Sequence, residues 1–330
     1  RLGTNLMRQK QTFRDTEDAQ AEIPKIATDE DSIPMETRPM GHKDSIYGFD
    51  RKQYKQPKGV NKELLGGEEI DSCYRLIAGL SSIAATIARI RYGRLPLEPK
   101  PELGHAANLL YMMTGRVPSP LEEKVMDVAL ILHADHGMNA STFAALVVAS
   151  TLSDIYFSVG SGIAALNGPL HGGANEQVIR MLAEIGAEEN VDEWFRWKID
   201  TKQKISGFGH RVYKAYDPRA RVLGPLAELL ARGKPRMQEQ YKTAMKLEKK
   251  VISTLGEEKK IFPNVDFYSG MVYGALGIPP EMFTPIFAVA RVSGWTARIL
   301  EYLEKNRIFR PRAIYTGDFD KQFVQLEKRK

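Results

Sequence analysis

The chain has 330 residues, enough to bury a sizeable core in one large domain or two smaller ones, and its composition of 43% hydrophobic and 27% charged residues is typical of soluble globular proteins. The net charge of +6 is not placed on one helix with interleaved aromatic residues, so we expect no nucleic-acid partner. One cysteine, Cys73, excludes an intrachain disulfide and fits a reducing compartment, and no signal peptide is apparent, so we expect a cytoplasmic protein.

The first 69 residues give no clear secondary-structure prediction. They contain few apolar residues, no sustained hydrophobic period and several Pro and Gly breaks. We therefore expect 1–69 to form an N-terminal arm whose structure the sequence does not define.

From Ile70 onward, apolar residues recur at helical spacing and Gly or Pro separates the segments. Gly115 is predicted to end the second helix. Ser119 and Glu122 form a capping box around Pro120, and Asp217 with Pro218 marks another helix start. The predicted helices lie near residues 70–92, 102–113, 120–133, 141–166 (two helices), 177–185, 218 onward, 236–255, 266–276 and 281–303. No convincing period-2 strand is present, so we predict an all-α fold.

Three details of this prediction depend on local composition. The longest apolar run, 142–166, is rich in Ala, Ser and Gly and carries Asp154, so we interpret it as buried helix and expect no membrane span. The stretch from 187 to Gly209 is predicted to be rich in loops. Pro285 is predicted to kink the 281–303 helix.

Four of the six histidines lie in three unusual settings. His133 and His136 belong to LHADHGMNAS, His171 to GPLHGGANE and His210 to KISGFGHRVYKAYDPRA. A fourth segment, FPNVDFYSG, places Asp266 among apolar and aromatic neighbours. These segments are the candidate site.

The local sequence suggests how His171 is presented. Pro169 fixes one backbone dihedral before it, and Gly172 with Gly173 removes side chains after it, so the chain can turn and a ligand can approach the imidazole. The alternative is a glycine-rich turn between helices that contains a buried structural histidine.

Metal binding is the first chemistry to weigh, because His133 and His136 with a distant histidine and aspartate could form a zinc site. Their spacing does not match an H-E-x-x-H pair, and the glycine-flanked histidines suit an organic ligand better. We therefore expect no metal.

Neutral histidines, one carboxylate and several arginines fit proton abstraction next to a thioester carbonyl. Such a weak carbon acid needs a carboxylate base, for which Asp266 is available, and a donor to the developing enolate oxygen. A carbonyl electrophile needs its own donor, so His171 and His210 can fill the two donor roles. A dicarboxylate needs arginines, and the candidates are Arg219, Arg291 and Arg310. Taken singly, each arginine could equally be ordinary surface charge.

The runs HADHGMNAST, GPLHGGANE, GFGHRVYKAYDPR, FPNVDFYSG and FTPIFAVARVSGW…RIFRPRAIYTG resemble the citrate synthase family, most closely its shorter prokaryotic form. The likeness covers about Ile70 to Gly317, with the motifs in the family's order and close to its spacing. The N-terminal 69 residues depart from it, because the family's opening strand and first helices are not recognisable there.

The resemblance implies a role for each motif residue. His171 matches the histidine that hydrogen-bonds the enol of acetyl-CoA, Asp266 the base and His210 the donor to the ketone oxygen of oxaloacetate. The residues that match the oxaloacetate ligands are His136, Arg219, Arg291 and Arg310. The loop that matches the coenzyme A contact consists of Lys204, Ile205, Ser206, Gly207 and Phe208. His42, His105 and His133 match no catalytic position and are interpreted as structural.

The resemblance also implies a homodimer or higher homo-oligomer, and an acyltransferase of the tricarboxylic acid cycle with no cofactor beyond the coenzyme A thioester used as substrate. The large domain is expected at 70–171 and 271–330, the latter including a C-terminal arm, and a small inserted domain at 172–270. In the family the arginine matching Arg310 reaches into the partner's active site. Alternatives left open are 2-methylcitrate synthase, which uses propionyl-CoA, and a catalytically silent assembly protein.

Overall fold

The computed structural model describes residues 68–168, 171–210, 213 and 215–329. The expected N-terminal arm therefore lies almost entirely outside the described residues, as does His42. The helices are α3 (Glu68–Arg91), α4 (His105–Thr114), α5 (Pro120–Ala134), α6 (Ala140–Ala149), α7 (Ile155–Leu166), α8 (Ala174–Ile185), α9 (Val191–Asp200), α10 (Pro218–Ala231), α11 (Pro235–Val251), α12 (Glu257–Lys259), α13 (Val265–Ala275) and α14 (Phe283–Leu303). Within the described residues there is no β-strand, which confirms the all-α prediction.

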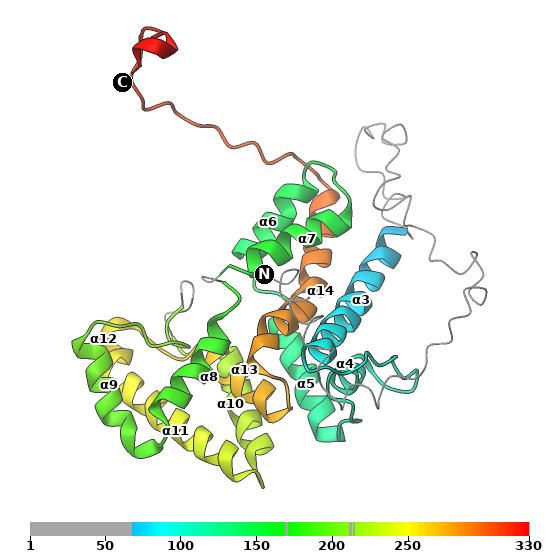
Figure 1. Cartoon of the computed structure of the whole chain (residues 1–330), viewed down its shortest axis with the longest axis vertical. Helices are drawn as coiled ribbons and strands as arrows, with labels where there is room; N and C mark the ends of the chain where they lie inside the picture. Colours follow the sequence, from blue (N-terminus) through cyan, green and yellow to red (C-terminus); the bar gives the residue numbers. More distant parts are fainter. Residues whose placement is uncertain (1–67, 169–170, 211–212, 214, 330) are drawn as a thin grey trace.

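The helices form two groups that lie side by side (Figure 1). Helices α3 to α7 and α14 make up one group, and α8 to α13 make up the other. The groups meet where α5 packs against α10 and α13. The C-terminal segment leaves the end of α14 and extends away from both groups.

Two helix boundaries confirm the local signals in the sequence. The Ser119 side chain accepts the Glu122 amide at 3.3 Å, and Glu122 accepts the Ser119 amide at 2.8 Å, so the predicted capping box begins α5. Gly115 ends α4 with a left-handed φ of 81°, a conformation that glycine adopts at little cost.

The hydrophobic core has two parts. The larger part joins both helix groups and runs from α3 to the first half of α14. The smaller part lies between α6, α7 and the second half of α14, around the fully buried Trp295. A Cβ at Gly162 would lie 3.0 Å from the Trp295 indole, so glycine in α7 lets the indole pack against the helix.

The structure corrects two predictions. Residues 191–200, placed in a loop-rich stretch, form α9, because Trp194 and Phe195 are buried against the core and give the segment an apolar face. The prediction that Pro285 kinks the 281–303 helix is also wrong. Helix α14 begins at Phe283, so Pro285 lies in the first turn, where its missing N–H has no intrahelical acceptor to lose.

The two groups correspond roughly to the domains expected from the sequence. Gly172 lies just before α8, at the change from one group to the other, whereas Gly270 lies inside α13. The exact domain limits remain a prediction. By length and composition alone α3 could also cross a membrane, a property that core helices of soluble proteins share.

Candidate active site

His171 lies between α7 and α8, with its ring half-buried and held by Ser141 at the start of α6. Its Nε2 is 2.8 Å from the Ser141 hydroxyl and 3.3 Å from the Ser141 backbone nitrogen. Because a backbone N–H can only donate, Nε2 is the acceptor and Nδ1 carries the proton of the neutral ring. Burial, reinforced by Arg291, holds the pKa of His171 below its usual value, which favours this neutral form.

Gly172 is required by the close approach of two segments. A Cβ at this position would lie 2.3 Å from the Leu166 carbonyl oxygen, and the Gly172 carbonyl accepts a hydrogen bond from the Thr284 hydroxyl at 2.9 Å. The glycine after the histidine therefore fixes the end of α7 against the start of α14. Pro169, expected to restrict the chain before His171, lies outside the described residues.

His210 and His136 come together from different segments. Their ring centroids are 5.0 Å apart in an edge-to-face arrangement, and Tyr213 stacks on His210 at 4.8 Å. The Tyr213 backbone N–H donates to Nδ1 of His210 at 3.1 Å, so Nε2 carries the proton in the neutral ring. Burial, followed by the nearby Arg219, lowers the pKa of His136. The lowered pKa favours the neutral form of His136.

Asp266 lies in the first turn of α13, which Asn264 caps by accepting the Asp266 N–H at 3.0 Å. Burial raises the pKa of the Asp266 carboxyl to about 6, although the charge of Arg219 opposes the shift. A carboxylate with this pKa is ionised at neutral pH and is more basic than an exposed aspartate. These are the properties of a general base.

Asp217 positions Arg219, a role that the sequence analysis missed. The Asp217 carboxylate accepts Nε of Arg219 at 3.1 Å and Nη2 at 2.8 Å, and its Oδ2 also accepts the Val265 N–H at 3.2 Å. It therefore joins the starts of α10 and α13, next to Asp266. The D-P-R sequence indicated a helix start, but the contact with Val265, 48 residues away, left no local signal.

Arg291 is only 1% exposed and is fixed by one strong hydrogen bond from its Nε to the His133 carbonyl oxygen, at 2.7 Å. Its Nη1 is buried without a partner among the described residues. Burial lowers the pKa of Arg291 to about 10, so the group is still cationic at neutral pH. A buried, charged nitrogen without a partner is a suitable ligand for a substrate carboxylate.

His133 is fully buried, and its Nδ1 bonds to the Ala129 carbonyl oxygen at 2.8 Å. Burial lowers its pKa to about 3, so the ring is neutral. These features agree with the structural interpretation of His133. His105 is likewise engaged within the fold, with its Nε2 3.2 Å from the Ser81 hydroxyl.

The loop 204–208 is fastened to the segment that leads into Asp266. The Asn264 N–H donates to the Gly207 carbonyl at 2.9 Å, and the Gly209 N–H donates to the Phe262 carbonyl at 2.9 Å. Within the loop, the side chains of Ile205 and Phe208 are buried in the core, so only their backbone could contact a ligand. Lys204 is exposed, and its charge acts on Asp266.

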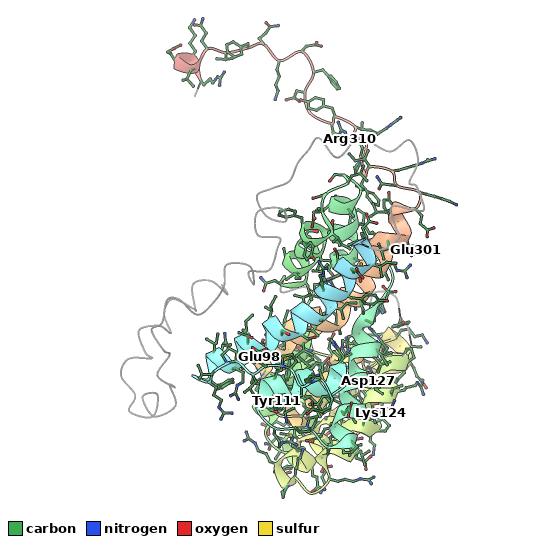
Figure 2. The ribbon with its side chains drawn as sticks, turned by 90° about the vertical axis from the view of Figure 1, so that its right-hand side faces the viewer. Glu98, Tyr111, Lys124, Asp127, Glu301 and Arg310 are labelled. Carbon is green, nitrogen blue, oxygen red and sulfur yellow. The ribbon has the colours of Figure 1, made fainter. Side chains whose placement is uncertain are left out.

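Arg310 is the candidate residue that the structure does not bring to the others. It is exposed and lies at the start of the extended C-terminal segment, at the end of the molecule opposite Lys124 (Figure 2). Its neighbour Phe309 is anchored, because its N–H donates to the Ser150 hydroxyl at 3.1 Å and its ring stacks on Tyr302. Within this chain Arg310 therefore cannot join the site without a rearrangement.

The other candidates converge around Arg291, whose charge acts on His136, His171 and Asp266. Neutral imidazoles, a carboxylate of raised pKa and two guanidinium groups are the side chains that proton transfer on an anionic substrate requires. Among the described residues, no group of three or more His, Cys, Asp or Glu side chains is placed to hold a metal ion.

Comparison with known proteins identifies the family. The family model described as the C-terminal domain of citrate synthase matches residues 5–312. Citrate synthase of Deinococcus radiodurans is 51% identical over 255 residues, which are 77% of this chain and 67% of that protein. The chain therefore belongs to the citrate synthase family.

Solved structures agree with this assignment. Citrate synthase from Pyrobaculum aerophilum is 48% identical with a TM-score of 0.74, over 81% of this chain and 65% of that one. The enzyme from Thermoplasma acidophilum, solved with carboxymethyl coenzyme A and oxaloacetate, is 40% identical with a TM-score of 0.75, over 83% and 72%. The chain thus spans about two thirds of the length of such relatives.

Proposed function

We propose that this chain is a citrate synthase, which condenses acetyl-CoA with oxaloacetate and hydrolyses the thioester to give citrate and coenzyme A. The observation that carries the proposal is the joint placement of Asp266, with its raised pKa, and the buried Arg291, whose Nη1 has no partner among the described residues. The first supplies a base and the second a carboxylate ligand. The names of the relatives and of the ternary complex support these substrates.

In the first step Asp266 removes a proton from the methyl group of acetyl-CoA. The proton on Nδ1 of His171 forms a hydrogen bond with the thioester oxygen, where negative charge develops. A neutral imidazole suits this role because its N–H and the enol O–H have similar acidities. An imidazolium is more acidic than the enol, so the match is poorer. The lowered pKa of His171 keeps the ring in that form.

In the second step the enolate carbon attacks the ketone carbon of oxaloacetate, and the ketone oxygen gains a proton. Nε2–H of His210 is the proposed donor, because its Nδ1 already accepts the Tyr213 N–H. His136, Arg219 and Arg291 hold the carboxylates, with Arg219 oriented by Asp217. Water then cleaves the citryl thioester and releases coenzyme A, for which Lys204 and the loop 204–208 provide the contact.

We infer that the working form is a homodimer. Large apolar or aromatic side chains are exposed on three neighbouring helices, among them Tyr74 of α3 at 66%, Phe143 of α6 at 45% and Phe157 of α7 at 57%. The C-terminal segment also exposes Ile314 at 90% and Phe323 at 83%. Apolar surface of this extent usually marks a protein interface.

The buried lone thiol of Cys73 fits a cytoplasmic location.

A thiol-release assay tests the proposal. Purified protein should release free coenzyme A from acetyl-CoA only when oxaloacetate is present, and the product should be citrate by mass. Propionyl-CoA should give a lower kcat/KM, although one methylene changes discrimination by only about 10- to 200-fold. Release without oxaloacetate would indicate a simple hydrolase, no release would indicate a silent member, and faster turnover of propionyl-CoA would indicate 2-methylcitrate synthesis.

The pH dependence should report the Asp266 carboxyl. Because only the ionised form accepts a proton, kcat/KM should fall about tenfold per pH unit below a pKa near 6 and level off above it. Removing the charge of Lys204, which stabilises that ionised form, should move the acid limb of the profile to higher pH in Lys204→Met. A limb that stays near pH 4 in both proteins would contradict the assignment of this base.

A further inference from the structure

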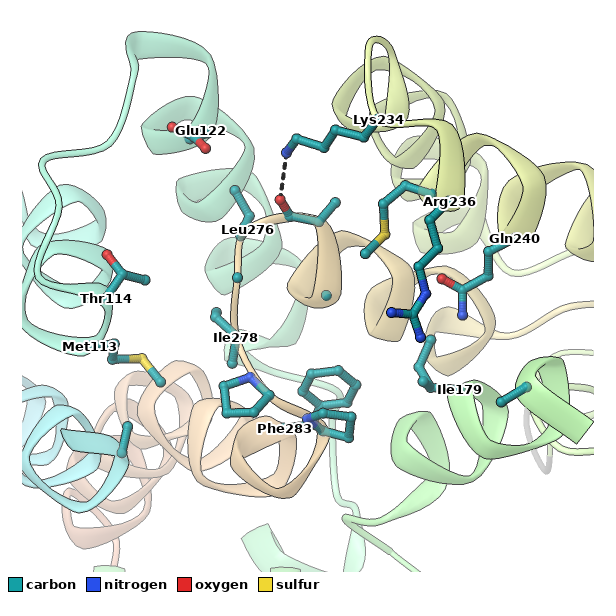
Figure 3. A pocket seen from close by; sticks show the side chains of 18 of the residues that line it. Met113, Thr114, Glu122, Ile179, Lys234, Arg236, Gln240, Leu276, Ile278 and Phe283 are labelled. Carbon is teal, nitrogen blue, oxygen red and sulfur yellow. Dashed lines mark hydrogen bonds between the residues drawn. The ribbon is translucent and has the colours of Figure 1, made fainter. Parts of the chain in front are cut away.

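A cavity of about 960 Å³ lies between the two helix groups, away from the candidate active site (Figure 3). One wall comes from the ends of α3 and α4 and the start of α5. The other wall comes from α8 and the start of α11. The floor is the segment 274–283, which links α13 to α14.

The helices that shape the active site reach this cavity with their opposite ends. Asp266 lies in the first turn of α13, whereas Ala275 at its end lines the cavity. Likewise Arg219 is at the start of α10, and Lys234 follows its end. At 1.5 Å per residue these helices separate the two sites by roughly 15 to 20 Å, so the cavity is distinct from the active site.

The lining of the cavity is rich in cations from both walls. Two carboxylates, of Glu122 and Glu239, also line it. The Glu122 carboxylate is already engaged, because Arg116 donates to both of its oxygens at 2.7 and 2.9 Å. The basic residues are Arg89, Arg94, Arg116, Lys234 and Arg236.

Arg236 and Arg94 are the cations that remain available. Each side chain is exposed, and neither forms a side-chain hydrogen bond or ion pair with the described residues. Lys234 lines the wall opposite that of Arg94, and its Nζ donates to the Ala275 carbonyl at 2.8 Å, so it is held at the cavity edge (Figure 3). Both helix groups therefore place positively charged side chains at the cavity.

The floor beneath these cations is apolar. Leu276, Ile278 and Phe283 of the floor are at most 2% exposed and pack directly beneath the space, and Ile179 of the α8 wall borders it (Figure 3). A concave apolar surface with a few charged groups at its rim is the usual form of a small-molecule site. Guanidinium groups at such a rim select phosphate or carboxylate.

We propose that this cavity binds a small organic dianion, with its phosphate or carboxylate groups between the cations of the two walls and an apolar body on the floor. The site is separate from the substrate site and nothing in the proposed reaction uses it. Because its walls belong to different helix groups, the bound molecule would bridge them.

Titration calorimetry on the full chain, with citrate and coenzyme A saturating the active site and constant ionic strength, tests the proposal. The probes are 2-naphthyl phosphate, phthalate and inorganic phosphate. An organic probe should bind saturably, and tighter binding of the naphthyl phosphate or of phthalate identifies phosphate or carboxylate as the preferred group. Absence of saturable binding by both, or inorganic phosphate binding as tightly as the organic probes, would overturn it.

Variants locate the binding. Arg236→Met and Arg94→Met, one from each wall, should each weaken the preferred probe by at least about tenfold, the effect of losing one charged hydrogen bond. Both side chains are exposed, so the variants should keep the thermal midpoint of the wild-type protein. Lys242→Met removes the same charge from an exposed position of α11 outside the cavity and should bind like the wild type. An equal loss in all three variants would show a general charge effect and refute the site.

Discussion

Asp266→Asn should reduce kcat by roughly 10²- to 10⁴-fold, the usual contribution of a general base, while the protein stays folded. The amide keeps the size of the carboxylate but cannot accept the methyl proton. The Asn264 cap of α13 is untouched, because it binds the backbone N–H of residue 266. Thiol release under saturating substrates measures the loss.

Two comparisons make the result specific to the base. Oxaloacetate should still bind to Asp266→Asn, because Arg219 and Arg291 are held by Asp217 and by the His133 carbonyl. Asp200→Asn changes the same chemical group at an exposed position of α9 and should retain full activity. If Asp266→Asn kept more than about a tenth of the wild-type kcat, Asp266 would not be the base.

A mixed dimer of Arg310→Ala and Asp266→Asn chains should regain activity that neither parent has. Arg310 is exposed at the start of a segment that extends away from the helices of its own chain, so we expect its carboxylate ligand in the partner's site (Figure 2). One site of the mixed dimer then combines an intact Asp266 with an intact Arg310 from the other chain. Random exchange of equal amounts should restore about a quarter of the wild-type activity.

The control for this experiment is a pair of variants whose two altered residues belong to the same candidate site of the same chain. Arg291→Met and Asp266→Asn both affect residues that meet within one chain, as the interaction of their charges shows. Their mixed dimer should therefore stay inactive. If purified Arg310→Ala and Asp266→Asn heterodimers were equally inactive, Arg310 would act within its own chain or not at all.

The sequence predicted those features that depend on neighbouring residues. The capping box at Ser119, the glycine stop at Gly115 and the Asp217 cap of α10 are local, and the structure confirms each. The class of the fold followed from helical periodicity, and the family from five motifs in order. Residues 191–200 were missed because their buried face contains only Val191, Trp194 and Phe195 among charged residues, too few for a clear period.

The geometry of the site could not be read from the sequence. The proton on Nδ1 of His171 depends on Ser141, 30 residues away, and the hydrogen bond of Arg291 reaches a carbonyl 158 residues away. The raised pKa of Asp266 results from burial, which exists only after folding. Contacts between residues so far apart in the chain produce no hydrophobic period or motif spacing from which they could be predicted.

The carboxylate of Asp217 has a consequence for acid stability. It faces the positive ends of two helix macrodipoles, at the starts of α10 and α13, as well as the charge of Arg219. Burial opposes its ionisation, but the hydrogen bonds from Arg219 outweigh this and hold the pKa of Asp217 below its usual value. A lowered pKa stabilises the fold above the unfolded value of about 3.9, and that contribution is lost as the pH falls through the folded pKa. Protonation of this one group would therefore weaken two helix starts at once, that of α10 beside Arg219 and that of α13 beside Asp266.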